Sequence, residues 1–340
     1  MSEPLPNRRR VLRVVATAAG LPLAITGLRA LAPKPELHTW RGEVLGALSE
    51  ISLWHSNAEF ARLTILKARL EIERLEKIFS LYRSDSEIVR LNHAGKLADA
   101  SAELRSVVET SQKLSQLSVG AFDISVQPLW RLYEAHFWSH TDTRPDIAMR
   151  ARDVARALVD FRAIDSGSST IAFARPGMAI TLNSIAQGYI TDAVADLLRN
   201  EGFESAVVDL GEFRTLGHHP DGRPWRLGIG DPKNAPGVTN TISLEDMALA
   251  VSGGYGTTFE PTGHFHHIFD PHTGSSANRL LQVAIIAPRA ATADALATAI
   301  YVAGEAAAPR MLAAHPQTKA ILTRLDGSSA TITEKSAVTA

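Results

Sequence analysis

Helical and β-like patterns of apolar residues follow one another irregularly along this chain. The clearest helix is predicted over 59–81, where Leu63, Leu66, Leu70 and Leu75 recur at helical steps with charged residues between them. Further helices are predicted over 101–117, 144–158, 184–199 and 292–302. Short β segments are predicted over 43–54, 169–174, 178–182, 206–210, 225–230, 248–251, 264–269, 282–286 and 319–323. Because the elements do not alternate as strict βαβ units, the order favours an α+β fold over a doubly wound sheet.

The N-terminus has the features of an export signal. Paired arginines at 8–10 precede an uncharged run from Val14 to Leu28 and small residues at 30–32. The run is short and interrupted for a membrane span, and the arginine pair is typical of the twin-arginine route. We therefore predict an export signal over 1–32 and a periplasmic location, with an inner-membrane anchor as the alternative.

Composition narrows the chemistry. The sequence of 340 residues has no cysteine, which excludes disulfides, thiolate metal sites and a cysteine nucleophile. A formal net charge of -1 gives no sign of a nucleic-acid partner. We predict a linker over 33–42, one domain over 43–325 and a flexible tail over 326–340.

Two turns in the second half could face a site. Asn183 to Tyr189 lies between a predicted strand and a predicted helix, where free backbone N–H groups and the helix dipole suit a phosphate. Gly188 there would let a ligand or another backbone approach closely. Simple helix capping is the alternative. The turn from Asp209 to Glu212 presents a carboxylate and a glycine after an apolar segment, which suits a site or any other turn.

A histidine cluster and a polar pair on an apolar helix are the other candidates. Alternation over 264–269 would place His264 and His266 on one face and His267 on the other, a weak zinc signature. On the late helix, Asp294 and Thr298 share a face among Ala, Leu and Ile residues. A charge there is costly unless it is paired or binds a cation, and oxygen-only ligands suit Mg²⁺. The alternative is that Asp294 only complements the helix dipole.

Read in order, these motifs resemble the ApbE family of FAD:protein FMN transferases. The resemblance covers roughly 43–325. Its most specific runs are Tyr82-Arg83-Ser84-Asp85-Ser86-Glu87, Ala121-Phe122-Asp123, His267-Ile268-Phe269-Asp270-Pro271-His272-Thr273-Gly274 and Asp294-Ala295-Leu296-Ala297-Thr298. The family implies a single α+β domain, with a mixed or antiparallel sheet flanked by helices.

The resemblance also implies roles for residues. Asp294 and Thr298 would bind Mg²⁺ at the FAD diphosphate, with Ser184 as a further oxygen ligand. His267 and Asp270 would be catalytic, as a base or an orienting group. The flavin-binding positions would be Leu45, Tyr82, Ala121, Phe122, Asp123, Thr181, Gln187 and Ala277.

Three positions depart from the family pattern. Thr181 stands where the family typically has Asp, Gln187 where it has Lys or Glu, and Gly254 where it has Asp. Thr and Gln can still hydrogen-bond the flavin or adenine, but all three changes remove charge near one cleft. The Asp294 and Thr298 pair is intact.

The predicted reaction is transfer of FMN from FAD to a threonine hydroxyl of an acceptor protein, such as a redox-complex subunit, with release of AMP. Mg²⁺ would neutralise the diphosphate while the protein positions the reactants. Hydrolysis of FAD to FMN and AMP at the same site remains an alternative. So do a non-catalytic, exported FAD-binding maturation factor and a periplasmic zinc-binding module on the histidine cluster.

Overall fold

The computed structural model describes residues 34–138, 146–233 and 237–334. Its centre is an eight-stranded antiparallel sheet in the order β1-β2-β6-β7-β10-β13-β14-β15. These strands are β1 (Glu36–Val44), β2 (Ala47–His55), β6 (Ala206–Asp209), β7 (Phe213–Leu216), β10 (Ala248–Ser252), β13 (Gln282–Ala287), β14 (Lys319–Thr323) and β15 (Ser329–Thr333). Most are short and bounded by turn residues, as the sequence predicts.

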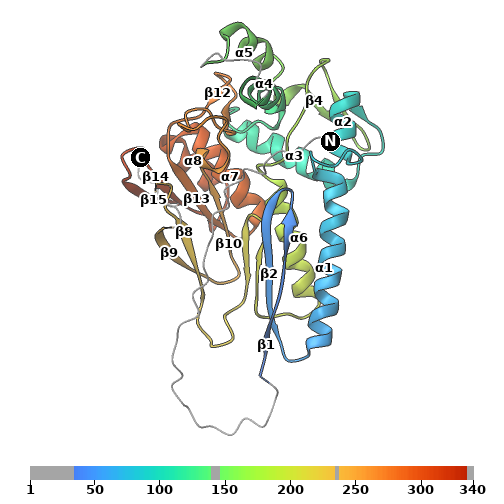
Figure 1. Ribbon diagram of the computed structural model, residues 1–340, viewed down its shortest axis with the longest axis vertical. Coiled ribbons are helices and arrows are strands. Elements are labelled where there is room, and N and C mark those ends of the chain that lie inside the picture. The colour runs from blue at the N-terminus through green and yellow to red at the C-terminus, as the bar shows by residue number, and fades with distance from the viewer. Residues whose placement is uncertain (1–33, 139–145, 234–236, 335–340) are drawn as a thin grey trace.

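Helices cover the sheet and cap one end of it (Figure 1). They are α1 (Ala58–Phe79), α2 (Glu87–Ala94), α3 (Ala102–Leu117), α4 (Gln127–Trp138), α5 (Met149–Arg156), α6 (Ala186–Asn200), α7 (Ala290–Ala303) and α8 (Ala308–Ala313). α7 packs against β10 and β13, while α6 packs against β6, β7, α1 and α7. The architecture is the predicted α+β fold with helices flanking an antiparallel sheet.

Smaller elements complete the fold. Strands β3 (Lys96–Leu97), β4 (Ile164–Ser166) and β5 (Ile171–Phe173) form one small sheet. β8 (Trp225–Gly230) pairs with β9 (Val238–Leu244), and β11 (Phe269–Asp270) with β12 (Ser275–Ser276). The single-turn helices are η1 (Ile124–Val126), η2 (Phe161–Ala163), η3 (Gly254–Gly256) and η4 (Glu305–Ala307). The β8–β9 ribbon packs apolar residues, Leu227 and Ile229 among them, against β10 and β13.

The predicted linker and tail are partly ordered strands, which corrects both predictions. Residues 36–42 belong to β1, which pairs with β2 across the two-residue turn Leu45-Gly46. Both turn residues have positive φ, 48° and 82°, as a tight hairpin of this hand requires. In the predicted tail, β15 pairs with β14 and Ile332 is buried. None of residues 36–42 is buried, and in β15 only Ile332 is, so backbone pairing with the neighbouring strand orders both segments despite their polar composition.

Two predicted strands do not form, and three helices, α2, α4 and α8, were missed. Over 178–182, the backbone of Ile180 bonds to the Asn92 side chain, and Thr181 N–H donates to the Ile124 carbonyl (2.8 Å). Over 264–269, only Phe269 lies in a strand. α4 was missed because its own apolar and aromatic residues are closely spaced along the sequence, so that no single apolar stripe marks it as a helix. Of the predicted helix 144–158, the structure shows Met149–Arg156.

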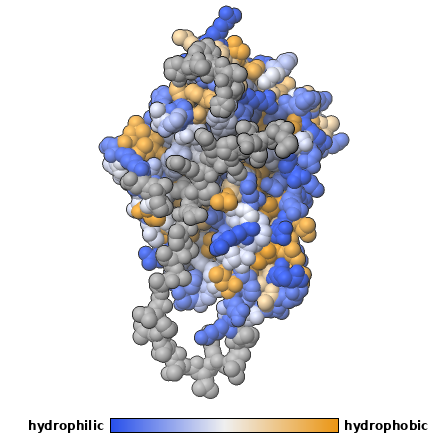
Figure 2. All heavy atoms as spheres, viewed as in Figure 1, coloured by the Kyte–Doolittle hydropathy of each residue, from blue (hydrophilic) through white to orange (hydrophobic). Residues whose placement is uncertain are grey.

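The main core lies between the sheet and α1, α3, α6 and α7, and a second aromatic cluster lies under α4. The face shown in Figure 2 is mostly hydrophilic, with separate hydrophobic patches. Among the helices of the described residues, none is both long and apolar enough to cross a membrane. The predicted export signal lies outside the described residues.

Candidate functional site

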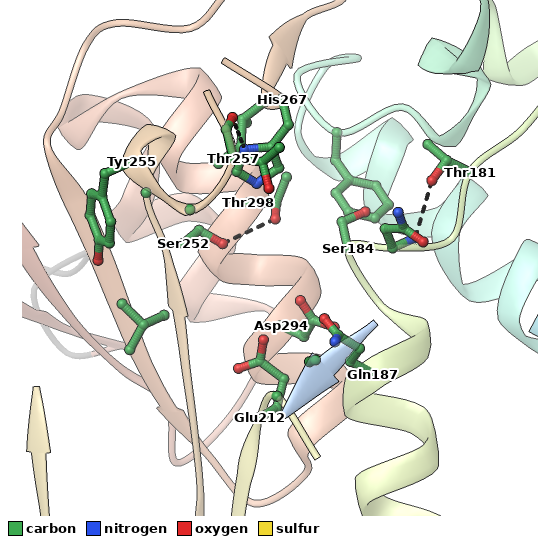
Figure 3. Close-up of a pocket in the computed structure, with 18 of the residues that line it drawn as sticks. Thr181, Ser184, Gln187, Glu212, Ser252, Tyr255, Thr257, His267, Asp294 and Thr298 are labelled. Carbon is green, nitrogen blue, oxygen red and sulfur yellow. Dashed lines mark hydrogen bonds between the residues drawn. The ribbon is translucent and has the colours of Figure 1, made fainter. Parts of the chain in front are cut away.

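One cavity lies where α6, α7 and the ends of several strands meet (Figure 3). Its polar walls come from the start of α6, the β6–β7 turn, the end of β10 and α7. Its other walls come from the loops around 121–123 and 252–257 and the β8–β9 ribbon. Nine of the predicted site residues line it: Ala121, Phe122, Asp123, Thr181, Ser184, Gln187, His267, Asp294 and Thr298.

The polar pair on α7 faces this cavity. Asp294 is only 4% exposed, although its helix neighbours are alanine and leucine. Its Oδ2 accepts a hydrogen bond from Gly188 N–H at 3.2 Å. Thr298 lies one turn further along α7, and its hydroxyl is 3.1 Å from that of Ser252. α7 therefore presents a carboxylate and a hydroxyl side by side, with a second hydroxyl from β10.

The start of α6 is held close to α7. A Cβ at Gly188 would lie 2.4 Å from the Ala290 carbonyl oxygen, so only glycine allows this approach. The prediction that Gly188 admits another backbone is thus confirmed. Ile185 precedes α6 without a side-chain cap, which argues against the simple capping alternative. The Asp294 carboxylate takes up one of the N–H groups that capping would satisfy.

Two further carboxylates enclose the same wall. Burial and the nearby charge of Asp294 raise the pKa of Glu212 well above its usual range. Burial raises the pKa of Asp209 to about 7, although Gly211 N–H donates to it. Within the described residues, no Lys or Arg forms an ion pair with Glu212 or Asp209. Glu212 is buried and Asp209 half-buried, and an acidic wall of this kind favours a bound cation, with donors that are all oxygen.

His267 lies on the opposite side of the cavity from Glu212 and Asp294 (Figure 3). Its Nδ1 lies 3.1 Å from the Thr257 carbonyl oxygen, and its backbone N–H donates to the same oxygen. A carbonyl can only accept, so Nδ1 carries the proton and Nε2 is the basic nitrogen. This tautomer suits a proton acceptor.

Asp123 lines the cavity but also organises its own loop. Its carboxylate accepts from Ser125 N–H and hydroxyl and from Phe161 N–H. Burial raises its pKa in spite of these bonds. Ala121 and Phe122 provide the apolar wall beside it.

Four predicted site residues do not line the cavity. Leu45 is buried in the hairpin turn, where its N–H donates to Glu76, and Ala277 is buried with its carbonyl 2.9 Å from His266 Nε2. Tyr82 is 62% exposed on the loop after α1. Asp270 folds its carboxylate back onto His272 N–H, and its carbonyl accepts from Thr273 and Gly274. These four residues therefore lie outside the cavity lining.

The departures from the family pattern have different settings. Thr181 and Gln187 line the cavity, whereas the backbone at Gly254 lies against the ring of His266. The predicted strand does not form, because 264–268 is a folded loop: His264 is exposed and His266 buried, so these two do not share a face, whereas His267 does lie apart from His266, as predicted. Across the described residues, no three His, Cys, Asp or Glu side chains are grouped to hold a metal ion.

Sequence reasoning missed several lining residues: Trp130, Ser252, Tyr255 and Thr257. The Tyr255 hydroxyl is 2.5 Å from Gln282 Nε2, which also donates to the Gly230 carbonyl. Ser252 and Tyr255 flank the Gly253-Gly254 pair, whose flexibility was the available signal. Trp130 and Thr257 stand in no pattern that singles them out.

The ApbE family model matches residues 45–322. The chain belongs to the ApbE family. It is 33% identical over 243 residues to the FAD:protein FMN transferase of Vibrio cholerae, covering 69% of this chain and 71% of that protein. It is 28% identical over 312 residues to the Haemophilus influenzae protein of the same name, covering 88% of each.

Solved ApbE structures have the same fold. The flavin transferase ApbE from Vibrio cholerae matches with a TM-score of 0.74 at 27% identity, over 88% of this chain and 97% of that one. The ApbE protein of Thermotoga maritima matches with a TM-score of 0.75 at 24% identity, over 89% and 99%. The second likeness shows the fold alone.

Proposed function

We propose that this ApbE protein is an FAD:protein FMN transferase that uses Mg²⁺ to move FMN from FAD onto a threonine of an acceptor protein. The observation that carries the proposal is the cavity itself. Asp294, Thr298 and His267 line one cavity, in a chain whose relatives are named for this reaction.

The donor set fits a magnesium ion. Asp294 and Thr298 would hold it from α7, and Ser184 lines the cavity at the start of α6. The acidic wall beside them, Glu212 and Asp209, would gain a positive neighbour. When bound, Mg²⁺ neutralises charge on a diphosphate.

His267 supplies the base in the proposed transfer. Its Nε2 takes the proton of the acceptor threonine while Nδ1–H stays bonded to the Thr257 carbonyl. The threonine oxygen forms a bond to the FMN phosphorus, and the bond from that phosphorus to the bridging oxygen breaks. AMP leaves with the electron pair. Asp270 holds the turn after His267 through its bond from His272 N–H.

The test uses FAD, MgCl₂ and the unflavinylated form of a candidate redox-complex subunit. The expected products are an acceptor with in-gel flavin fluorescence and one AMP for each FMN transferred. Replacement of the target threonine by alanine should abolish the fluorescence. The Asp294→Ala enzyme should transfer FMN at least about 100-fold more slowly. AMP and free FMN in equal amounts, without a labelled acceptor, would establish hydrolysis instead.

We also propose export to the periplasm, on the sequence of residues 1–32 alone. Replacing Arg9 and Arg10 together by lysine should keep the full chain in the cytoplasmic fraction. Secretion of that variant at the wild-type level would argue against the twin-arginine route. A wild-type chain recovered from the membrane fraction would favour the N-terminal anchor.

A further inference from the structure

We propose that His266 is a positioning residue, whose ring sets the place and orientation of the neighbouring His267. The inference rests on the proposed function for the role of His267, but the contacts that support it are independent of any reaction. His266 is 1% exposed, whereas His267 borders the cavity. Two adjacent histidines therefore have opposite surroundings.

The Ser276 hydroxyl bonds to both the backbone N–H and the backbone carbonyl of His266. His266 N–H donates to Ser276 Oγ at 2.8 Å, and that hydroxyl donates to the His266 carbonyl at 2.7 Å. Ser276 lies in β12, which pairs with β11. These bonds tie the loop before His267 to the short β11–β12 hairpin.

The ring of His266 connects Ile268, the residue after His267, to Ala277 and Asn278. Ile268 N–H donates to His266 Nδ1 at 3.2 Å. His266 Nε2 lies 2.9 Å from the Ala277 carbonyl oxygen and 3.3 Å from Asn278 Oδ1. An N–H donor at one nitrogen and a carbonyl at the other require the neutral ring with its proton on Nε2. Burial also lowers the pKa of His266 to about 4, which keeps it in this form.

His267 is thus held from two sides. The Ser276 hydroxyl holds the backbone at 266, the His266 ring accepts from the N–H at 268, and the Thr257 carbonyl accepts from both N–H groups of His267. Without the His266 ring, Ser276 and Thr257 would still hold residues 266 and 267, and Ala277 N–H would still donate to the Ile268 carbonyl (2.8 Å), but Ile268 N–H would lose its acceptor and the 267–268 peptide would be free to turn. The Nδ1 acceptor of His266 is the group that prevents this.

Gly254 makes room for this arrangement. A Cβ at 254 would lie 2.5, 2.7 and 2.8 Å from three atoms of the His266 ring. The Gly254 N–H donates to the Tyr301 hydroxyl, which holds the glycine against the ring. The glycine at this position therefore does more than remove charge, because the His266 ring fills the space of a side chain.

Two amide substitutions, each of which reproduces the hydrogen-bonding role of one ring nitrogen, separate the functions of the two nitrogens. In His266→Asn, the amide oxygen can accept from Ile268 N–H in place of Nδ1, but the bond to Ala277 is lost. In His266→Gln, the amide nitrogen can donate to Ala277, but the acceptor for Ile268 is lost. We expect kcat within about 3-fold of wild type for Asn and at least about 10-fold lower for Gln. KM for FAD should change little in either.

A measurement without turnover keeps the test independent of the reaction. In ¹⁵N spectra of the wild type and the Asn variant, His267 should be the Nδ1–H tautomer. In the Gln variant it should be a mixture of tautomers. His264→Ala, an exposed histidine on the same loop, is the matched control and should match wild type in both measurements. Equal losses in Asn and Gln, or no loss in either, would overturn the proposal.

The fit between Gly254 and His266 gives a second test. Gly254→Asp alone should unfold at a lower temperature than wild type, because the new side chain meets the ring. Gly254→Asp with His266→Ala should recover part of that loss, whereas additive losses would contradict the predicted contact. If the wild type transfers no FMN, the proposed function fails, while the tautomer and double-variant results still decide the role of His266.

Discussion

Two groups of acidic side chains lie on either side of the junction between α6 and α7: an outer group in which the buried Asp192 pairs with arginine, and an inner group that lines the cavity. At the outer group, Asp192 and Arg214 have side chains 3% and 5% exposed and approach to 2.5 Å. Arg289 adds a second contact to Asp192 at 3.2 Å. Asp192 also accepts from Ala290 and Ala291 N–H, which fixes the start of α7.

The inner group consists of Asp294, Glu212 and Asp209. It lies near the same junction but lines the cavity. Asp294 lies about one turn after the residues that Asp192 holds, Asp209 is the last residue of β6, and Glu212 follows in the β6–β7 turn. Here burial and the charges of Asp294 and Asp209 raise the pKa of Glu212, and within the described residues neither Glu212 nor Asp209 forms an ion pair with a Lys or Arg. The outer group positions α7, and the inner group uses that position to present acidic oxygen atoms.

The difference indicates how buried acids divide between structure and function in this protein. A buried ion pair is costly to break because the remaining charge has no partner. Where the described residues provide no cation for a buried acid, a bound cation offsets the free-energy cost of burying its charge. Opposite responses to substitution and to Mg²⁺ should therefore distinguish the two groups.

The largest expected effect is on the outer group. Arg214→Met should leave Asp192 without its main buried partner and lower the free energy of unfolding by about 3–5 kcal/mol. Urea denaturation followed by circular dichroism measures this. Arg199→Met is the control, because the Arg199–Asp246 pair is about half exposed and should cost less than about 1 kcal/mol. Equal losses in the two variants would remove the distinction.

The next effect concerns the inner group and Mg²⁺. At a free concentration about 100 times its dissociation constant, Mg²⁺ should stabilise the wild type by about 2.7 kcal/mol. Asp294→Asn keeps an acceptor for Gly188 N–H but loses the charge, so its unfolding should not respond to Mg²⁺. Arg214→Met should respond as the wild type does, at a lower starting stability. A Mg²⁺ response that survives in Asp294→Asn would place the cation elsewhere.

Much of the fold could be predicted because the apolar periodicity is strong where one face is buried. The predicted helices 59–81 and 101–117 correspond closely to α1 and α3, and the predicted strand 319–323 is β14. β9 was missed because most of its residues are polar and exposed. At 178–182 and 264–269, side chains of distant residues satisfy the backbone, which local pattern cannot reveal.

The site divides in the same way. Asp294 and Thr298 stood out because a charge interrupts an apolar helix, and both line the cavity. Arg214 could not be identified, since its partner is 22 residues away in sequence on another element. Nor could the sequence show that His266 faces inward and His267 toward the cavity. Those assignments need the loop geometry.

The smallest expected effect has opposite signs in the two groups. Asp209 has a pKa raised to about 7 in the folded protein, so its ionisation lowers stability as the pH rises from about 4 to 7. Asp209→Asn keeps the acceptor for Gly211 N–H and removes that cost. At pH 8 without Mg²⁺ it should therefore be about 2 kcal/mol more stable than the wild type, with the gain shrinking toward pH 4. Asp192→Asn should instead be less stable at pH 8, because Arg214 and Arg289 lose their shared anion. Thermal unfolding at pH 5 and pH 8 compares the two, and a loss of stability in both variants at pH 8 would show that the inner acids are structural after all.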